Sequence, residues 1–158
     1  MTQQHQVSKT IKNLEAAFAG EAMANRKYLY FAKCCHALGE DAIAEVFEKT
    51  AEQETAHAFG HLQLLFPEET LTVEKMLQLA IEGETHEYTE MYPEFRNTAL
   101  DERNSAAVTE MDEQVKESKE HAEMFAKVLL LAEKRFAALT KIEKRHAQRY
   151  QDTLDSTK

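Results

Sequence analysis

The stretch AEQETAHA, residues 51–58, decides the fold of this chain. It places Glu54 and His57 three residues apart, in phase with the apolar positions of a helix that we expect over residues 41–66. A carboxylate that faces a helical core without a partner is strongly unfavourable. A bound metal ion is a partner that suits both a carboxylate and an imidazole. The stretch therefore predicts a metal-binding helix in an all-α protein.

Three other segments place ligand-type residues in the apolar stripe of a helix. They are Glu21 near the N-terminus, Glu84 with Glu87 in the middle, and Glu143 with His146 near the C-terminus. Dinuclear metal sites in four-helix bundles take one Glu from each of two helices and a Glu-x-x-His pair from each of the other two. The four segments match this pattern and predict a dinuclear metal site.

The composition supports long helices in a single domain, residues 1–158. Gly and Pro together number six, and neither occurs from residue 94 to residue 158. Such a sequence lacks the turn residues that a sheet requires. We expect an all-α fold.

Helices are predicted over residues 8–36 and 41–66, and a third from Thr72 that Pro93 should kink or interrupt. A turn is expected at residues 101–104. Apolar residues then recur at heptad spacing from Met111 to Tyr150. One unbroken helix there would be roughly 70 Å long. We expect it to bend, to pair with a neighbour or to exchange with another subunit.

Charge and hydropathy exclude two classes of partner. The net charge of −9 argues against nucleic-acid binding, because no basic face is available for the phosphates. Segments long and apolar enough to span a membrane, or to act as a signal peptide, are absent from the sequence. The only two cysteines, Cys34 and Cys35, are adjacent and indicate a reducing compartment. These features predict a cytoplasmic protein.

Three long motifs, in order, resemble those of the rubrerythrins. They are AFAGE at residues 17–21, AEQETAHA at 51–58 and GETHEYTEMYP at 83–93, and the likeness resumes at residues 136–150. The resemblance implies a ferritin-like four-helix bundle with two iron ions that reduces hydrogen peroxide to water, as part of the defence against oxidative stress. Manganese accepts the same ligands.

The resemblance also implies roles for individual residues. Its metal ligands would be Glu21, Glu54, His57, Glu84 and Glu87. Tyr28 and Tyr92 match tyrosines that line the family's site, where their hydroxyls could hydrogen-bond a peroxide or a carboxylate. These two tyrosines are the candidate catalytic residues.

The fourth helix of the bundle is ambiguous. Glu143 and His146 keep the Glu-x-x-His motif whole and are the favoured pair. The alternative is His121, which has Ser118 where the glutamate belongs, with Glu117 supplying the carboxylate from the adjacent register. If Glu143 and His146 are the ligands, residues 101–126 are a helical insertion, and the long C-terminal segment extends the bundle. We expect a homodimer.

Rubrerythrins commonly carry a rubredoxin-like domain with paired C-x-x-C motifs, which this sequence does not contain. Electrons are then expected from a separate, rubredoxin-like donor protein. The alternative function is iron oxidation and storage, as in ferritins, which use a related site. A metal-free structural bundle is disfavoured, because few Lys or Arg residues lie in phase with the inward acids.

Overall fold

The structure is a computed structural model that describes residues 8–157. It consists of two compact units, Met1–Leu71 and Thr72–Lys158, which we describe separately. The described residues form helices and connecting turns, and no β-strand occurs between residues 8 and 157. The all-α prediction is confirmed.

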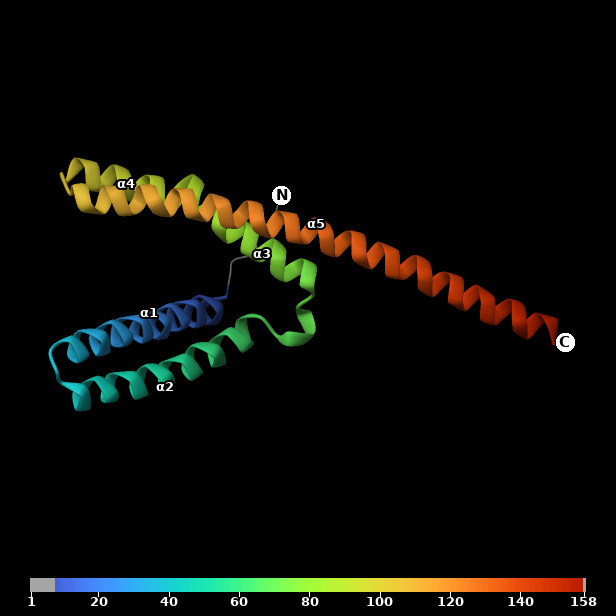
Figure 1. Cartoon of the computed structure of the whole chain (residues 1–158), viewed down its shortest axis with the longest axis horizontal. Coiled ribbons are helices and arrows are strands. Elements are labelled where there is room, and N and C mark those ends of the chain that lie inside the picture. The colour runs from blue at the N-terminus through green and yellow to red at the C-terminus, as the bar shows by residue number, and fades with distance from the viewer. Residues whose placement is uncertain (1–7, 158) are drawn as a thin grey trace. The chain divides into compact units, whose positions relative to one another are not determined.

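The first unit is a helical hairpin (Figure 1). Helix α1 spans Lys9–Ala37 and α2 spans Asp41–Leu65, followed by a short 3₁₀ turn, η1, at Glu68–Thr70. The Ser8 hydroxyl caps α1 by accepting a hydrogen bond from the Ile11 N–H. Gly39, with a φ of +77°, provides the left-handed turn between the helices. The predicted boundaries agree to within one residue.

Small side chains bring α1 and α2 close together. Ala44, Ala51 and Ala58 recur every seventh residue of α2 and are buried. Across the interface, the Asn25 side-chain amide of α1 donates to the Ala51 carbonyl at 2.6 Å and to the Thr55 hydroxyl at 2.9 Å. Apolar packing and this hydrogen-bonded bridge together fix the register of the hairpin.

The second unit is also a hairpin, whose first arm is interrupted. Helix α3 spans Val73–His86, a π-helical segment, η2, spans Glu87–Met91, and α4 spans Tyr92–Asp101. Pro93 lies in the first turn of α4, where its missing N–H is tolerated. The predicted interruption occurs, but it lies at η2, before the proline, and the α-helix has resumed at Tyr92 when it reaches Pro93.

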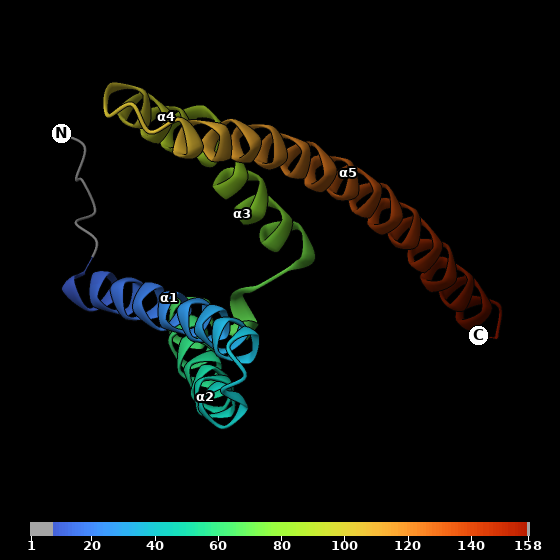
Figure 2. The same ribbon diagram turned by 60° about the vertical axis from the view of Figure 1, so that its left-hand side comes forward.

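The second arm is helix α5, Ser105–Ser156, which runs for 52 residues without a break. Its length is about 78 Å at 1.5 Å per residue. The turn before it lies at residues 102–104, as predicted, and the Asn104 side chain caps α5 by accepting from the Ala107 N–H. In Figures 1 and 2, α3 and α4 run alongside the N-terminal part of α5, which continues past the start of α3.

The residues of α5 that pack against α3 and α4 lie between positions 107 and 132, and Ser118 and Ala122 are the buried members. The segment 101–126, which could be an insertion, supplies the end of α4, the turn and much of this packed part of α5. Its assignment as an insertion stays a prediction. None of the helices described between residues 8 and 157 combines the length and the apolar character that a membrane span requires.

The alanine stripe of α2 generates the first testable prediction. Replacing Ala51 with Leu forces extra methylene groups into a site that is 1% exposed. We expect the free energy of unfolding to fall by about 1–3 kcal/mol, measured by urea denaturation. Ala56→Leu, on the exposed face of the same helix, is the control and should change stability little. Equal effects of the two substitutions would contradict this packing.

His36 ties the end of α1 to α2. Its Nδ1 lies 2.7 Å from an oxygen of Asp41, and its Nε2 lies 3.1 Å from an oxygen of Glu48. The hydrogen bond to Asp41, followed by that to Glu48, raises the pKa of His36 above its usual value of 6.5. The imidazolium therefore stabilises the folded state fully below that value, and the contribution is lost as pH rises through the higher pKa of the folded protein.

We therefore expect His36 to contribute a loss of stability in the metal-free protein as pH rises above 6.5. His36→Gln should make the free energy of unfolding depend less on pH over this range. The measurement is urea denaturation at each pH, with the difference between wild type and variant as the readout. A difference that does not vary with pH would show that His36 is not held in its charged form.

Candidate metal centre

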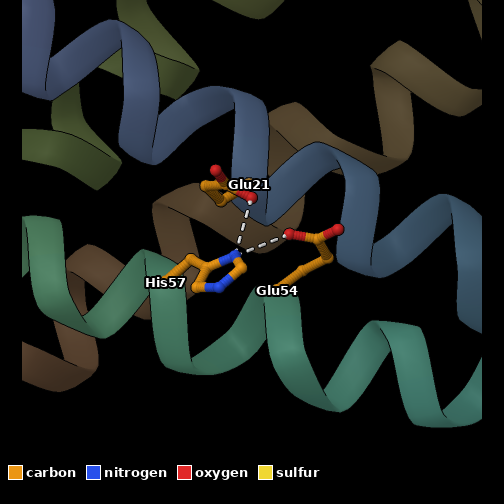
Figure 3. A group of neighbouring side chains, drawn as sticks. All are labelled: Glu21, Glu54 and His57. Atoms are coloured by element: carbon orange, nitrogen blue, oxygen red, sulfur yellow. Dashed lines mark hydrogen bonds and ion pairs between the residues drawn. The ribbon is translucent and has the colours of Figure 1, made fainter.

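The first unit holds one group of ligand-type side chains (Figure 3). Glu21 comes from α1, and Glu54 and His57 come from α2. The Nδ1 atom of His57 lies 3.1 Å from Oε2 of Glu54 and 3.7 Å from Oε2 of Glu21. One ligand atom from each residue falls within 4.8 Å of the others, close enough to converge on a metal ion.

The two carboxylates of this group are within reach of a shared proton. The hydrogen bond with Glu54, followed by partial burial, raises the pKa of Glu21. The same hydrogen bond, followed by that with His57, lowers the pKa of Glu54. The side chains of Glu21 and Glu54 are only 30% and 17% exposed, so two negative charges here need compensation. A metal cation would supply it in place of the proton.

The second unit holds a corresponding group. Ser118 of α5 donates a hydrogen bond from Oγ to Oε2 of Glu87, at 2.9 Å. One turn further along α5, Nδ1 of His121 lies 3.4 Å from Oε2 of Glu84, on α3. That Glu84 oxygen is buried and has no hydrogen-bond partner. A buried carboxylate oxygen beside an imidazole is suited to binding a cation.

The π-helical segment η2 begins at Glu87 and orients the residues that follow. The Tyr92 N–H donates to the Glu87 carbonyl, so Tyr92 follows Glu87 by one wide turn. Burial, followed by the negative charges of Glu87 and Glu84, raises the pKa of Tyr92. The Tyr92 phenol thus lies near both carboxylates and stays protonated at neutral pH.

Tyr28, the other predicted catalytic residue, lies on α1 two turns after Glu21. Its ring packs on that of Phe47, with the centroids 5.9 Å apart. Tyr28 is half-buried within the hairpin, on the side of α1 that faces α2. The catalytic roles of the two tyrosines stay predictions.

The structure treats the two candidate pairs of the fourth helix differently. Glu143 and His146 are exposed in the part of α5 that extends beyond α3. His121, from the alternative pair, makes the contact with Glu84, whereas its proposed companion Glu117 is exposed. Ser118, rather than Glu117, shares the buried face with His121. The sequence signal for the burial of Ser118 was its place in the heptad pattern, three residues before His121.

Each of the two groups, taken by itself, has the residue types that bind metal ions. Two carboxylates and one imidazole make up each group, with Glu21, Glu54 and His57 in the first unit and Glu84, Glu87 and His121 in the second. The raised pKa of Glu21 beside Glu54, and the buried Glu84 oxygen that makes no hydrogen bond, mark where each group lacks positive charge.

Comparisons with known proteins show which family this chain resembles. The profile of the Rubrerythrin family matches residues 12–129, which include all six of these ligand candidates. A rubrerythrin of Porphyromonas gingivalis is 39% identical over 106 residues, covering 60% of this chain and 53% of that protein. A putative rubrerythrin of Methanocaldococcus jannaschii is 31% identical over 143 residues, covering 78% of this chain and 70% of that protein.

A solved structure of fully reduced, all-ferrous nigerythrin is 31% identical, and the match covers 80% of this chain and 68% of that one, with a TM-score of 0.38. The chain spans about half the length of several curated relatives it matches, with 53% and 56% of two rubrerythrins covered. The family profile, by contrast, covers well over half of this chain. The chain therefore belongs to the rubrerythrin family, whose proteins bind di-iron sites.

Proposed function

We propose that this protein is a non-haem di-iron peroxidase that reduces hydrogen peroxide to water. The observation that carries the proposal is the carboxylate and histidine contact in each hairpin, Glu54 with His57 in one and Glu84 with His121 in the other. Family membership supports a di-iron protein of the oxidative-stress type. Dinuclear centres in helical bundles take their carboxylates and histidines from four helices.

The ligands that we assign to the metal pair are Glu21, Glu54, His57, Glu84, Glu87 and His121. When bound, two ferrous ions supply the two electrons that reduce peroxide to water. Iron is proposed because the relatives are di-iron proteins, although manganese accepts the same ligands. Glu143 with His146 is the alternative for the ligands of the fourth helix.

The residues around the metal ligands have supporting roles. Tyr92, kept protonated by burial and by the adjacent carboxylates, can donate a hydrogen bond from Oη to a bound peroxide oxygen. Tyr28 is proposed for the same function on the other hairpin. Ser118 holds Glu87 in place by donating to its Oε2 atom. The alanine-lined helix contacts keep the groups rigid.

The remaining proposals concern partners and location. We propose that electrons come from a separate, rubredoxin-like donor protein, because membership of the rubrerythrin family suggests redox partners. Cys34 and Cys35 are free thiols, which supports a reducing, cytoplasmic location. We also propose a homodimer.

The function is tested by stopped-flow oxidation. Protein loaded with two ferrous ions per chain is mixed either with hydrogen peroxide or with air-saturated buffer. We expect oxidation by peroxide to be faster, by about tenfold or more, and to stop when the bound iron is consumed. Faster oxidation by air, with mineral accumulating beyond two irons per chain, would instead establish iron oxidation and storage.

The ligand assignment predicts different outcomes for two histidines on α5. His121→Ala removes an imidazole next to the buried Glu84 oxygen and should lower iron content below two per chain. His146→Ala, further along the same helix, is the matched control and should retain both ions. Iron is measured by elemental analysis after gel filtration, with folding checked by circular dichroism. The reverse result would assign the site to Glu143 and His146.

A further inference from the structure

Helix α5 carries one continuous seam of residues at alternating spacings of three and four, the pattern of a coiled coil. Its N-terminal members are buried or half-buried, and they are Met111, Val115, Ser118, Ala122, Phe125, Leu129 and Ala132. Its C-terminal members are exposed, and they are Phe136, Leu139, Glu143, His146, Tyr150 and Thr153. The seam does not change phase between the two halves.

The change from buried to exposed follows from where α3 begins. Glu87 contacts Ser118, and Glu84 contacts His121. The two arms are therefore antiparallel, and moving three residues towards the N-terminus on the first arm corresponds to moving three residues towards the C-terminus on α5. Continued at this pitch, Val73, the first residue of α3, falls opposite Ala132. Beyond that point the second unit offers α5 no partner helix. Figures 1 and 2 show this end of α5 extending past α3.

The exposed part of the seam keeps large apolar side chains. Phe136, Leu139 and Tyr150 are 40%, 44% and 75% exposed. Helical segments of this length owe most of their stability to packing of an apolar face. A heptad seam is the surface that packs against another helix, so its occupant should be a helix with the same repeat.

The seam is complementary to itself when two copies run antiparallel. A coiled-coil seam has two alternating positions, called a and d. In an antiparallel pair, a residue at position a of one helix faces a residue at position d of the partner helix. Aligned at its centre, Glu143 then faces the partner's His146, Leu139 faces the partner's Tyr150 and Phe136 faces the partner's Thr153. A parallel pair would instead set Glu143 against Glu143, which is unfavourable in a low-dielectric seam.

The residues beside the seam are compatible with this arrangement. The flanking positions include Thr140 and Ala147, which are small and allow two helices to approach closely. Lys141, Lys144 and Arg145 lie at the outer positions, away from the seam, where their charges stay in water. The segment also lies outside residues 12–129, the part that matches the family profile.

We propose that residues 133–156 of α5 form an antiparallel coiled coil with the same segment of a second copy of this chain, aligned by two Glu143–His146 contacts. The coiled coil continues the seam that α3 occupies in the first half of the helix. Glu143 and His146 set orientation and register, as polar residues in coiled-coil seams do. The dimer contact uses Glu143 and His146, which are not among the six ligands that we assign to the metal pair, so it requires that the α5 ligand is His121.

Disulfide cross-linking of the full chain tests orientation. In a background with Cys34→Ser and Cys35→Ser, Leu139→Cys and Tyr150→Cys are made singly, mixed, and oxidised mildly at low micromolar concentration. The antiparallel pairing predicts a mixed 139–150 disulfide, identified by mass spectrometry, at a yield about tenfold above either variant alone. Leu131→Cys, at an outer position, is the control and should not cross-link.

Charge substitutions test the register within the same assay. His146→Glu sets carboxylate against carboxylate in both central layers and should lower the 139–150 yield by about tenfold, equivalent to about 1.4 kcal/mol. The double variant with Glu143→His and His146→Glu restores opposite pairs and should recover it. Homotypic 139–139 disulfides, absence of cross-linking, or no effect of His146→Glu would overturn the proposal. Iron content in the His121→Ala experiment is a separate readout, so failure of the coiled coil is distinguishable from failure of the proposed function.

Discussion

Negative charge in the contact faces of the helices is the constraint on which the rest of this structure depends. Each hairpin places carboxylates where a helical protein normally places apolar side chains, and each meets the cost with a histidine from the same or the facing helix. The compensation is incomplete, because the neighbouring Glu54 raises the pKa of Glu21 and one buried Glu84 oxygen lacks a hydrogen-bond partner. A metal pair would complete it.

The second hairpin meets this constraint in its own way. The part of α5 that contacts these acids has Ser118 three residues before His121, and the Ser118 hydroxyl holds the carboxylate of Glu87. The π-helical turn that starts at Glu87 then brings Tyr92 close to the same acids. The short side chain of Ser118 on α5 is thus compensated by the facing arm, which supplies the Glu87 carboxylate and the π-helical turn that begins there.

The length of α5 has a related physical basis. A heptad seam stabilises a helix only where another helix covers it, and α3 covers it only as far as its own first residue. The helix nevertheless continues to Ser156 with its apolar pattern unchanged. Because the heptad pattern of α5 continues past α3, we propose that a second copy of the chain covers the remaining part of the seam.

The sequence by itself determined the helices and the ligand candidates that lie within one helix. Glu54 and His57 are three residues apart, so helical geometry alone brings them together, and the absence of Gly and Pro after residue 93 predicted the long final helix. Tertiary structure decided how residues of different helices meet. The heptad pattern passes through Ser118 and His121 and through Glu143 and His146 alike, and only the register of α5 against α3 sets His121 beside Glu84. A repeating seam shows which face of a helix packs, whereas the length and position of the neighbouring helix decide where that packing ends.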